Sequence, residues 1–116
     1  MVRDISVMVC RSPWSKARGL IGRPVPGPGN GVLIENCRQV HTFFMRYAID
    51  AVHLDRDGLV LAIHTLQPWR IGPWSLRSAK VLEMAAGEAQ RLGLRPGDRP
   101  NLIDEESRAS TRNSRV

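Results

Sequence analysis

One four-residue segment, Asp55-Arg56-Asp57-Gly58, constrains the fold more than any other part of the sequence. It joins two runs of β-forming residues, 49–55 and 59–66. Because an Asp-Gly pair supplies the positive φ that a tight turn requires, the two runs predict an antiparallel β-hairpin. Residues 59–63 are apolar at every position, so we expect the second strand to lie in the middle of its sheet with both faces covered.

Other short elements are predicted on both sides of this hairpin. Ser12 is suited to N-cap a helix with Pro13 at its first position, and Gly22 is suited to end it, which predicts a helix over residues 13–21. Residues 88–94 predict a second helical segment of one or two turns. Runs of β-forming residues predict further strands at 5–9, 32–35, 40–45, 79–85 and 99–103. Two segments rich in proline and glycine predict loops, at 24–31 and 67–76.

This order of elements predicts a mainly β (α+β) fold. We expect a small curled or closed barrel-like sheet of about six short strands with one or two short helices, because curling or closure protects the strand edges. The 116 residues are enough for one domain, which we place at residues 1–103. Residues 104–116 are polar and aperiodic and are expected to form a disordered C-terminal tail.

The sequence predicts a cytoplasmic protein with no membrane partner. No apolar stretch approaches the ~18 residues needed to span a bilayer, and Arg11 interrupts the N-terminus before a signal-peptide-like segment can form. In a reducing compartment the two cysteines, Cys10 and Cys37, are expected to be free thiols.

The net charge of +6 is concentrated in the first half of the chain, where residues 1–47 carry seven basic and two acidic side chains. Such an excess of positive charge is compatible with nucleic acid or an anionic ligand as partner. Fifteen of the seventeen basic residues are arginine, however, and there is no run of adjacent basic residues. Nor are aromatic residues interleaved with them as in single-strand binders, so a solvated face is the favoured interpretation.

Six motifs follow one another over about residues 18 to 99. They are Arg18-Gly-Leu-Ile-Gly-Arg23, Val40-His-Thr-Phe-Phe-Met-Arg46 with Ile49-Asp50, Leu54-Asp-Arg-Asp-Gly58, Gln67-Pro-Trp-Arg70, Val81-Leu-Glu-Met-Ala-Ala-Gly87 and Gly93-Leu-Arg-Pro-Gly-Asp98. In this order and spacing they resemble the DUF192 (UPF0127) family. The sequence departs from the family pattern at Phe44, where glycine is common, and at Ala48 and Ala85, where proline is common. The family has no established activity, substrate or cofactor, so the resemblance implies a fold and no chemistry.

The segment from His41 to Asp50 is the first candidate site. If it is a strand, His41 and Met45 share one face, and Arg46 lies four residues before Asp50. An arginine and an aspartate four residues apart can pair across a bend. The pair either anchors an anion in a cleft through Arg46 or locks a turn as a structural ion pair, and the residues leave both interpretations open.

The second candidate site is the proline-rich loop that contains Trp69 and Arg70, followed by Trp74. Tryptophan and arginine are enriched at binding hot spots, and a stiff loop loses little entropy when it binds. The alternative is that Trp69 closes one end of the sheet as a lid.

No cofactor, metal site or catalytic set is predicted. Cys37, His41, Asp50, His53 and His64 have donor atoms, but their spacing matches no metal-binding pattern. The predicted function is a small non-enzymatic binding module with a cleft for a small anionic ligand or a partner peptide. Two alternatives stay open, nucleic-acid binding through the basic N-terminal half and a metal-dependent or His/Asp hydrolase that uses His41 with Asp50.

Overall fold

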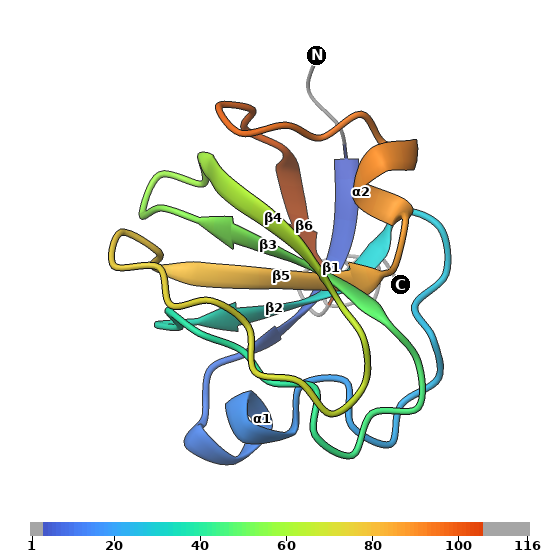
Figure 1. Cartoon of the computed structure of the whole chain (residues 1–116). Helices are drawn as coiled ribbons and strands as arrows, with labels where there is room; N and C mark the ends of the chain where they lie inside the picture. Colours follow the sequence, from blue (N-terminus) through green and yellow to red (C-terminus); the bar gives the residue numbers. More distant parts are fainter. Residues whose placement is uncertain (1–3, 106–116) are drawn as a thin grey trace, which may run out of the picture.

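The structure, a computed structural model that describes residues 4–105, is a curled six-stranded mixed sheet with two short helices (Figure 1). The elements in chain order are β1 (Asp4–Cys10), α1 (Pro13–Arg18), β2 (Asn30–Glu35), β3 (Ile49–Leu54), β4 (Val60–Leu66), β5 (Lys80–Ala85), α2 (Glu88–Arg91) and β6 (Asn101–Asp104). The strand order is β4-β3-β5-β2-β1-β6. β1 runs parallel to β2 and β6, and the remaining neighbours are antiparallel. The predicted mainly β fold class is confirmed.

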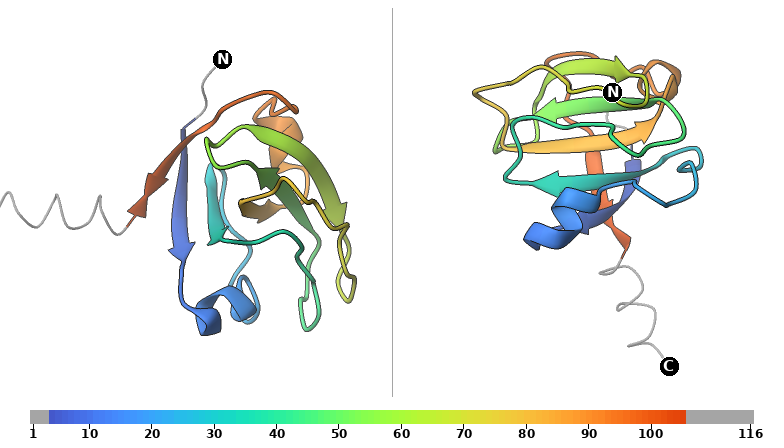
Figure 2. Two further views of the ribbon diagram at one scale, coloured as in Figure 1. Left: turned by 90° about the vertical axis from the view of Figure 1, so that its left-hand side faces the viewer. Right: turned by 60° about the horizontal axis from the view of Figure 1, so that its bottom comes forward.

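The sheet curls strongly but stays open (Figure 2). Its two edge strands, β4 and β6, do not pair with each other. Two backbone hydrogen bonds of 2.8 Å instead join Val60, at the start of β4, to Gly97 and Asp98 in the turn before β6. The term "barrel-like" therefore describes the shape only loosely.

The predicted hairpin is confirmed, because β3 and β4 are antiparallel and Gly58 has a φ of 84°. The carboxylate of Asp55 accepts the backbone N–H groups of Asp57 and Leu59, both at 2.9 Å, which fixes the turn.

The prediction that residues 59–66 form a central, covered strand was wrong. β4 is an edge strand, and most of its residues are only half-buried. The central strand of the hairpin is β3, which lies between β4 and β5 and is buried at all six positions. Its polar residues Asp50 and His53 concealed this from the sequence, because the hydrogen bonds of the Asp50 carboxylate and of His53 Nδ1 form only in the folded chain.

Residues 40–45 form a loop and not the predicted strand. The loop makes one isolated bridge, between His41 and Ile71, and Phe44 has a φ of 66° that no regular strand contains. Two element ends also differ from expectation. The helix α1 stops at Arg18 because Gly19 has a φ of 51°, and Asp104 ends β6 although it was expected in the tail. The expected tail beyond residue 105 lies outside the described residues.

Two apolar clusters pack on the two faces of the sheet, and the alternation of side chains along each strand assigns residues to them. One cluster includes Leu82 and Met84 of β5 and the buried residues of the α2 segment. The other includes Val81 of β5, Ile34 of β2, Leu20 after α1 and Met45. Cys10 and Cys37 are free thiols, as predicted. Within residues 4–105 no helix is both long enough and apolar enough to cross a membrane.

Candidate functional site

Glu83 is a carboxyl group buried on the α1 side of the sheet. It follows Val81 by two positions on β5, so its side chain lies on the same face as that residue. Only 4% of its surface is exposed. Burial raises the pKa of Glu83 from 4.5 to about 7, and the backbone N–H of Leu20 opposes this rise. A group of this kind is costly to ionise in the fold and is therefore a marker of a functional site.

A cavity of about 330 Å³ opens beside this carboxyl group. We call it the Glu83 cavity. Most of its lining is apolar, with a few polar and charged groups, which is the composition typical of small-ligand sites. Its lining comes from the α1 end, from β2, from the β2–β3 loop and from β5: Lys16, Ala17, Arg18, Gly19, Leu20, Ile21, Ile34, Cys37, Gln39, Val40, His41, Met45 and Glu83.

Gly19 lets the backbone after α1 approach Glu83 closely. A Cβ atom at this position would lie 2.8 Å from the carboxylate Oε1 of Glu83. The φ of 51° at Gly19 also lies in the region that glycine adopts most readily. The sequence Arg18-Gly-Leu therefore ends the helix and brings the backbone of Leu20 against the acid.

The six site residues predicted from the sequence do not meet in one pocket. His41 and Met45 line the Glu83 cavity. Trp69 contacts the ring of Phe43, which in turn stacks on His41. Arg46 and Arg70 are exposed on the adjoining loops and line none of the cavities described here.

Asp50 has a structural role on the opposite face of the sheet. Its carboxylate accepts the Thr65 hydroxyl at 2.7 Å and the backbone N–H groups of Gly87 and Ala89 at 3.0 Å, and so holds the start of α2. Among residues 4–105 it forms no ion pair with Arg46. The predicted Arg46–Asp50 pair was therefore wrong, because Asp50 is satisfied by donors that only the folded chain brings to it.

Four rings form an exposed aromatic patch next to the Glu83 cavity: His41, Phe43, Phe44 and Trp69. Ring centroids are 5.2 Å apart for His41 and Phe43, 6.2 Å for Phe43 and Trp69, and 4.8 Å for Phe44 and Trp69. The outermost members, Phe44 and Trp69, are 67% and 55% exposed. Both have left-handed backbones, with φ of 66° and 64°, a conformation that is strained for large side chains.

Thr42 joins the two loops that carry the aromatic patch. It is fully buried. Its hydroxyl donates to the carbonyl of Gln67 at 2.6 Å and accepts the backbone N–H of Arg70 at 2.8 Å. Its own carbonyl accepts the backbone N–H of Trp69 at 2.9 Å. These bonds hold the patch in one arrangement before any partner binds.

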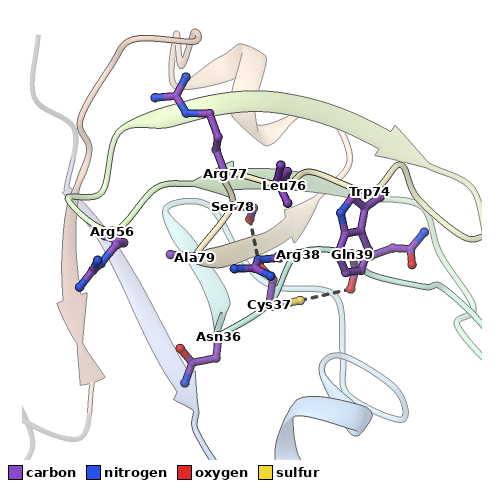
Figure 3. A pocket seen from close by; sticks show the side chains of 10 residues that line it. All are labelled: Asn36, Cys37, Arg38, Gln39, Arg56, Trp74, Leu76, Arg77, Ser78 and Ala79. Carbon is purple, nitrogen blue, oxygen red and sulfur yellow. Dashed lines mark hydrogen bonds between the residues drawn. The ribbon is translucent and has the colours of Figure 1, made fainter.

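A larger and more open cleft of about 960 Å³ lies on the other side of Cys37 (Figure 3). We call it the arginine cleft. It is lined by Asn36, Cys37, Arg38, Gln39, Arg56, Trp74, Leu76, Arg77, Ser78 and Ala79. The Cys37 thiol donates to the carbonyl of Gln39 at 3.2 Å, and burial raises its pKa, so it is protonated at neutral pH and poorly suited to act as a nucleophile.

The five candidate metal donors do not gather around one point. No group of three or more His, Cys, Asp or Glu side chains within residues 4–105 is arranged to hold a metal ion. His53 and His64 do approach each other, with ring centroids 5.8 Å apart. His53 is fully buried and pairs with the Ser78 hydroxyl at 3.0 Å, and burial lowers its pKa so that the ring stays neutral.

Sequence reasoning missed Glu83, Gly19 and Lys16 as site residues. One signal was present, because Glu83 is the single charged residue within an otherwise apolar run, Val81-Leu-Glu-Met-Ala-Ala86. An acid in such a run is either exposed on a half-covered strand or buried for a purpose. The sequence does not distinguish these cases, because the covering segment lies more than sixty residues earlier in the chain.

Relatives of this chain have been named but not assigned an activity. A UPF0127 protein of Pyrococcus abyssi is 35% identical over 64 residues, 55% of each chain, and a UPF0127 protein of Pyrococcus horikoshii is 33% identical over 60 residues, 52% of each chain. The chain thus spans about half the length of these curated relatives.

Two solved structures share the fold. A protein of Sinorhizobium meliloti described as a "putative transcription regulator" matches with a TM-score of 0.71 and 28% identity, over 80% of this chain and 78% of that one. A protein of unknown function from Novosphingobium aromaticivorans matches with a TM-score of 0.70 and 23% identity, over 80% of this chain and 71% of that one. The model of the DUF192 family ("Uncharacterized ACR") matches residues 1–102. The motifs, the fold and these matches agree, and the chain belongs to the DUF192 (UPF0127) family.

Proposed function

We propose that this protein is a small non-enzymatic binding module whose ligand occupies the Glu83 cavity. The observation that carries the proposal is the carboxyl of Glu83, which is buried by the fold and yet borders an open cavity. Ionising such a group opposes folding, and replacing it with an apolar side chain would remove that cost. A ligand that donates a hydrogen bond to the carboxyl would compensate for the cost and explain why the group is retained.

The lining of the cavity indicates the chemistry of this ligand. The apolar walls favour a compact apolar body, and Glu83 favours a hydrogen-bond donor at its inner end. Lys16 and Arg18 line the same cavity and favour an anionic group on the ligand. The ammonium of Lys16 donates to the Asn36 carbonyl at 3.1 Å, which leaves two of its protons for a ligand. We therefore propose a small organic anion with an apolar body.

The placement of the polar groups supports binding without catalysis. A hydrolase that uses His41 with Asp50 needs the two side chains in one pocket. His41 borders the Glu83 cavity and accepts the backbone N–H of Phe43 at 3.1 Å, whereas Asp50 borders a hollow beside α2.

The test is a thermal-shift screen with small carboxylates and phosphates, followed by calorimetric titration of those that stabilise the protein. 4-Aminobenzoate and benzoate form a matched pair, because only the first carries a donor for Glu83. A ligand present at about 100 times its Kd stabilises the fold by about 2.7 kcal/mol, which raises Tm by several degrees.

We expect Lys16→Ala and Glu83→Gln to weaken binding and Arg46→Ala, outside the cavity, to leave it unchanged. The proposal fails if no anion stabilises the protein, or if Arg46→Ala removes the response while Glu83→Gln keeps it.

A second candidate function is nucleic-acid binding at the arginine cleft. It is supported by the three arginines that line the cleft beside Trp74, with no acidic residue in that lining, and by the description of the Sinorhizobium meliloti protein. Binding of this kind would weaken steeply as salt concentration rises. Reversing the charge of Arg38 and Arg77 together should then abolish binding to a short oligonucleotide, while Glu83→Gln leaves it intact.

A further inference from the structure

One end of the molecule combines positive charge with exposed apolar side chains. The β2–β3 loop, residues 36–48, and the first part of the β4–β5 loop, residues 67–72, lie side by side at the end that carries α1 (Figures 1 and 2). Residues 36–48 and 67–72 contain three arginines and no acidic residue. They also carry three of the large apolar side chains that are more than half exposed: Phe44, Trp69 and Ile71.

The aromatic patch is the most prominent part of this end. Phe44 and Trp69 form a contacting pair that is more than half exposed and lines none of the cavities described above. Two contacting aromatic residues, one on each loop and both in strained left-handed conformations, are unusual at a protein surface. The bonds to Thr42 hold them there. Packing inside this protein does not account for the strain, because both rings face outwards.

Arginines flank the patch on both loops. Arg46 follows Phe44 by two residues and Arg70 follows Trp69 directly. Both guanidinium groups are exposed, and neither forms an ion pair with an acidic side chain of residues 4–105. Arg70 bonds instead to the Trp69 carbonyl at 3.3 Å. Each of the two loops therefore carries one exposed ring and, within two residues of it, an exposed arginine that is available to an anionic partner.

We propose that the aromatic patch, with Arg46 and Arg70, docks on the surface of an anionic lipid membrane. Tryptophan and phenylalanine insert at the boundary of headgroups and acyl chains, and arginine binds anionic headgroups. An exposed pair of rings on loops, outside these cavities, suits a soft planar surface better than a peptide, which binds in a groove or along a strand edge. The rings of Phe44 and Trp69 are tilted by 56° and touch each other, so they offer no open parallel faces for successive bases. Docking at a surface needs no spanning segment.

The first test uses vesicle co-sedimentation with phosphatidylcholine alone and with phosphatidylcholine mixed with phosphatidylglycerol. We expect the wild-type protein to bind the anionic vesicles and to be released by salt. The double variant Phe44→Gly/Trp69→Asn removes both rings. Glycine and asparagine tolerate a positive φ, so this variant should fold, and a thermal melt checks that it does. We expect its affinity for the anionic vesicles to fall at least tenfold.

The second test separates charge from the rings. Arg46→Glu/Arg70→Glu should reduce binding to anionic vesicles by at least tenfold, since each basic residue near such a surface contributes about fivefold in affinity. Arg95→Glu/Arg99→Glu, near the turn before β6 at the opposite end (Figure 1), is the matched control and should retain most of the binding.

Absence of binding to the anionic vesicles would overturn the proposal, as would binding that the Phe44→Gly/Trp69→Asn variant retains. Binding to a single-stranded oligonucleotide that this variant loses, without vesicle binding, would assign the patch to nucleic acid and would also overturn it.

Discussion

Replacing Glu83 with glutamine should make the stability of this protein less dependent on pH. The folded protein holds a proton on Glu83 more tightly than the unfolded chain does, because burial raises the pKa from 4.5 to about 7. Below pH 4.5 the carboxyl is protonated in both states and the group imposes no charge on the fold. Between pH 4.5 and about 7 the unfolded chain releases this proton while the folded protein keeps it, so stability falls as the pH rises, and the loss is complete once the folded protein ionises the buried group above about 7.

The size of this loss follows from the same values. A rise in pKa from 4.5 to about 7 corresponds to about 3 kcal/mol between the two ends of the pH window. Glutamine has a similar shape and no charge, so Glu83→Gln should be within about 1 kcal/mol of the wild-type protein at pH 4. At pH 8 it should be more stable than the wild-type protein by about 2 to 3 kcal/mol.

The measurement is urea unfolding of both proteins between pH 4 and pH 8, followed by tryptophan fluorescence. The difference in free energy of unfolding between the two proteins cancels the contributions of the other titrating groups. Glu105→Gln, which removes a carboxyl at an exposed position, is the control and should give a much smaller change in this difference. If the difference in free energy of unfolding between wild-type protein and Glu83→Gln stays constant from pH 4 to pH 8, burial does not raise the pKa of Glu83 and the reasoning is refuted.

Three further predictions concern the supports of the site. Thr42→Val keeps the shape of the side chain but removes the hydroxyl that bonds Gln67 and Arg70, so it should lower stability by about 1 to 3 kcal/mol and speed proteolysis between residues 67 and 72. Gly19→Ala should lower Tm more than Gly97→Ala, because both positions have positive φ but only at Gly19 would a Cβ meet Glu83; equal effects would show that the contact is unimportant. Arg46→Ala should change the free energy of unfolding by less than about 0.5 kcal/mol, whereas Asp50→Ala should cost about 2 kcal/mol or more, since it leaves the Gly87 and Ala89 N–H groups unpaired.

Local signals in the sequence predicted most of the secondary structure. The Asp57-Gly58 turn, the Ser12 cap with Pro13, and the six strands were recognisable because each depends on neighbouring residues. The predictions failed at positions where contacts with distant segments determine the local structure. Residues 40–45 read as a strand because they are apolar and aromatic, but Thr42 holds them as a loop through bonds to residues 67–70. The central position in the sheet was assigned to β4 instead of β3, because the hydrogen-bond partners of Asp50 and His53 lie on other strands and loops.

The candidate site was predicted only in part, for the same reason. His41 and Met45 line the Glu83 cavity, but the cavity's most unusual group, Glu83, was not recognised. The interpretation of Phe44 shows what a resemblance adds. The resemblance implies glycine as the common residue here, and the left-handed backbone found at Phe44, with a φ of 66°, is one that glycine adopts freely. The comparison of the sequence with the family pattern identifies Phe44 as a departure from glycine. The structure adds that the phenylalanine ring is exposed and contacts Trp69.

The most direct test of the account is a crystallographic fragment screen with small organic anions. Our account predicts that fragments collect in the Glu83 cavity, with a donor within hydrogen-bond distance of the Glu83 carboxyl and the anionic group near Lys16 or Arg18. Fragments that bind repeatedly in the arginine cleft or elsewhere, while the Glu83 cavity holds only water, would contradict the claim that this cavity is the ligand site.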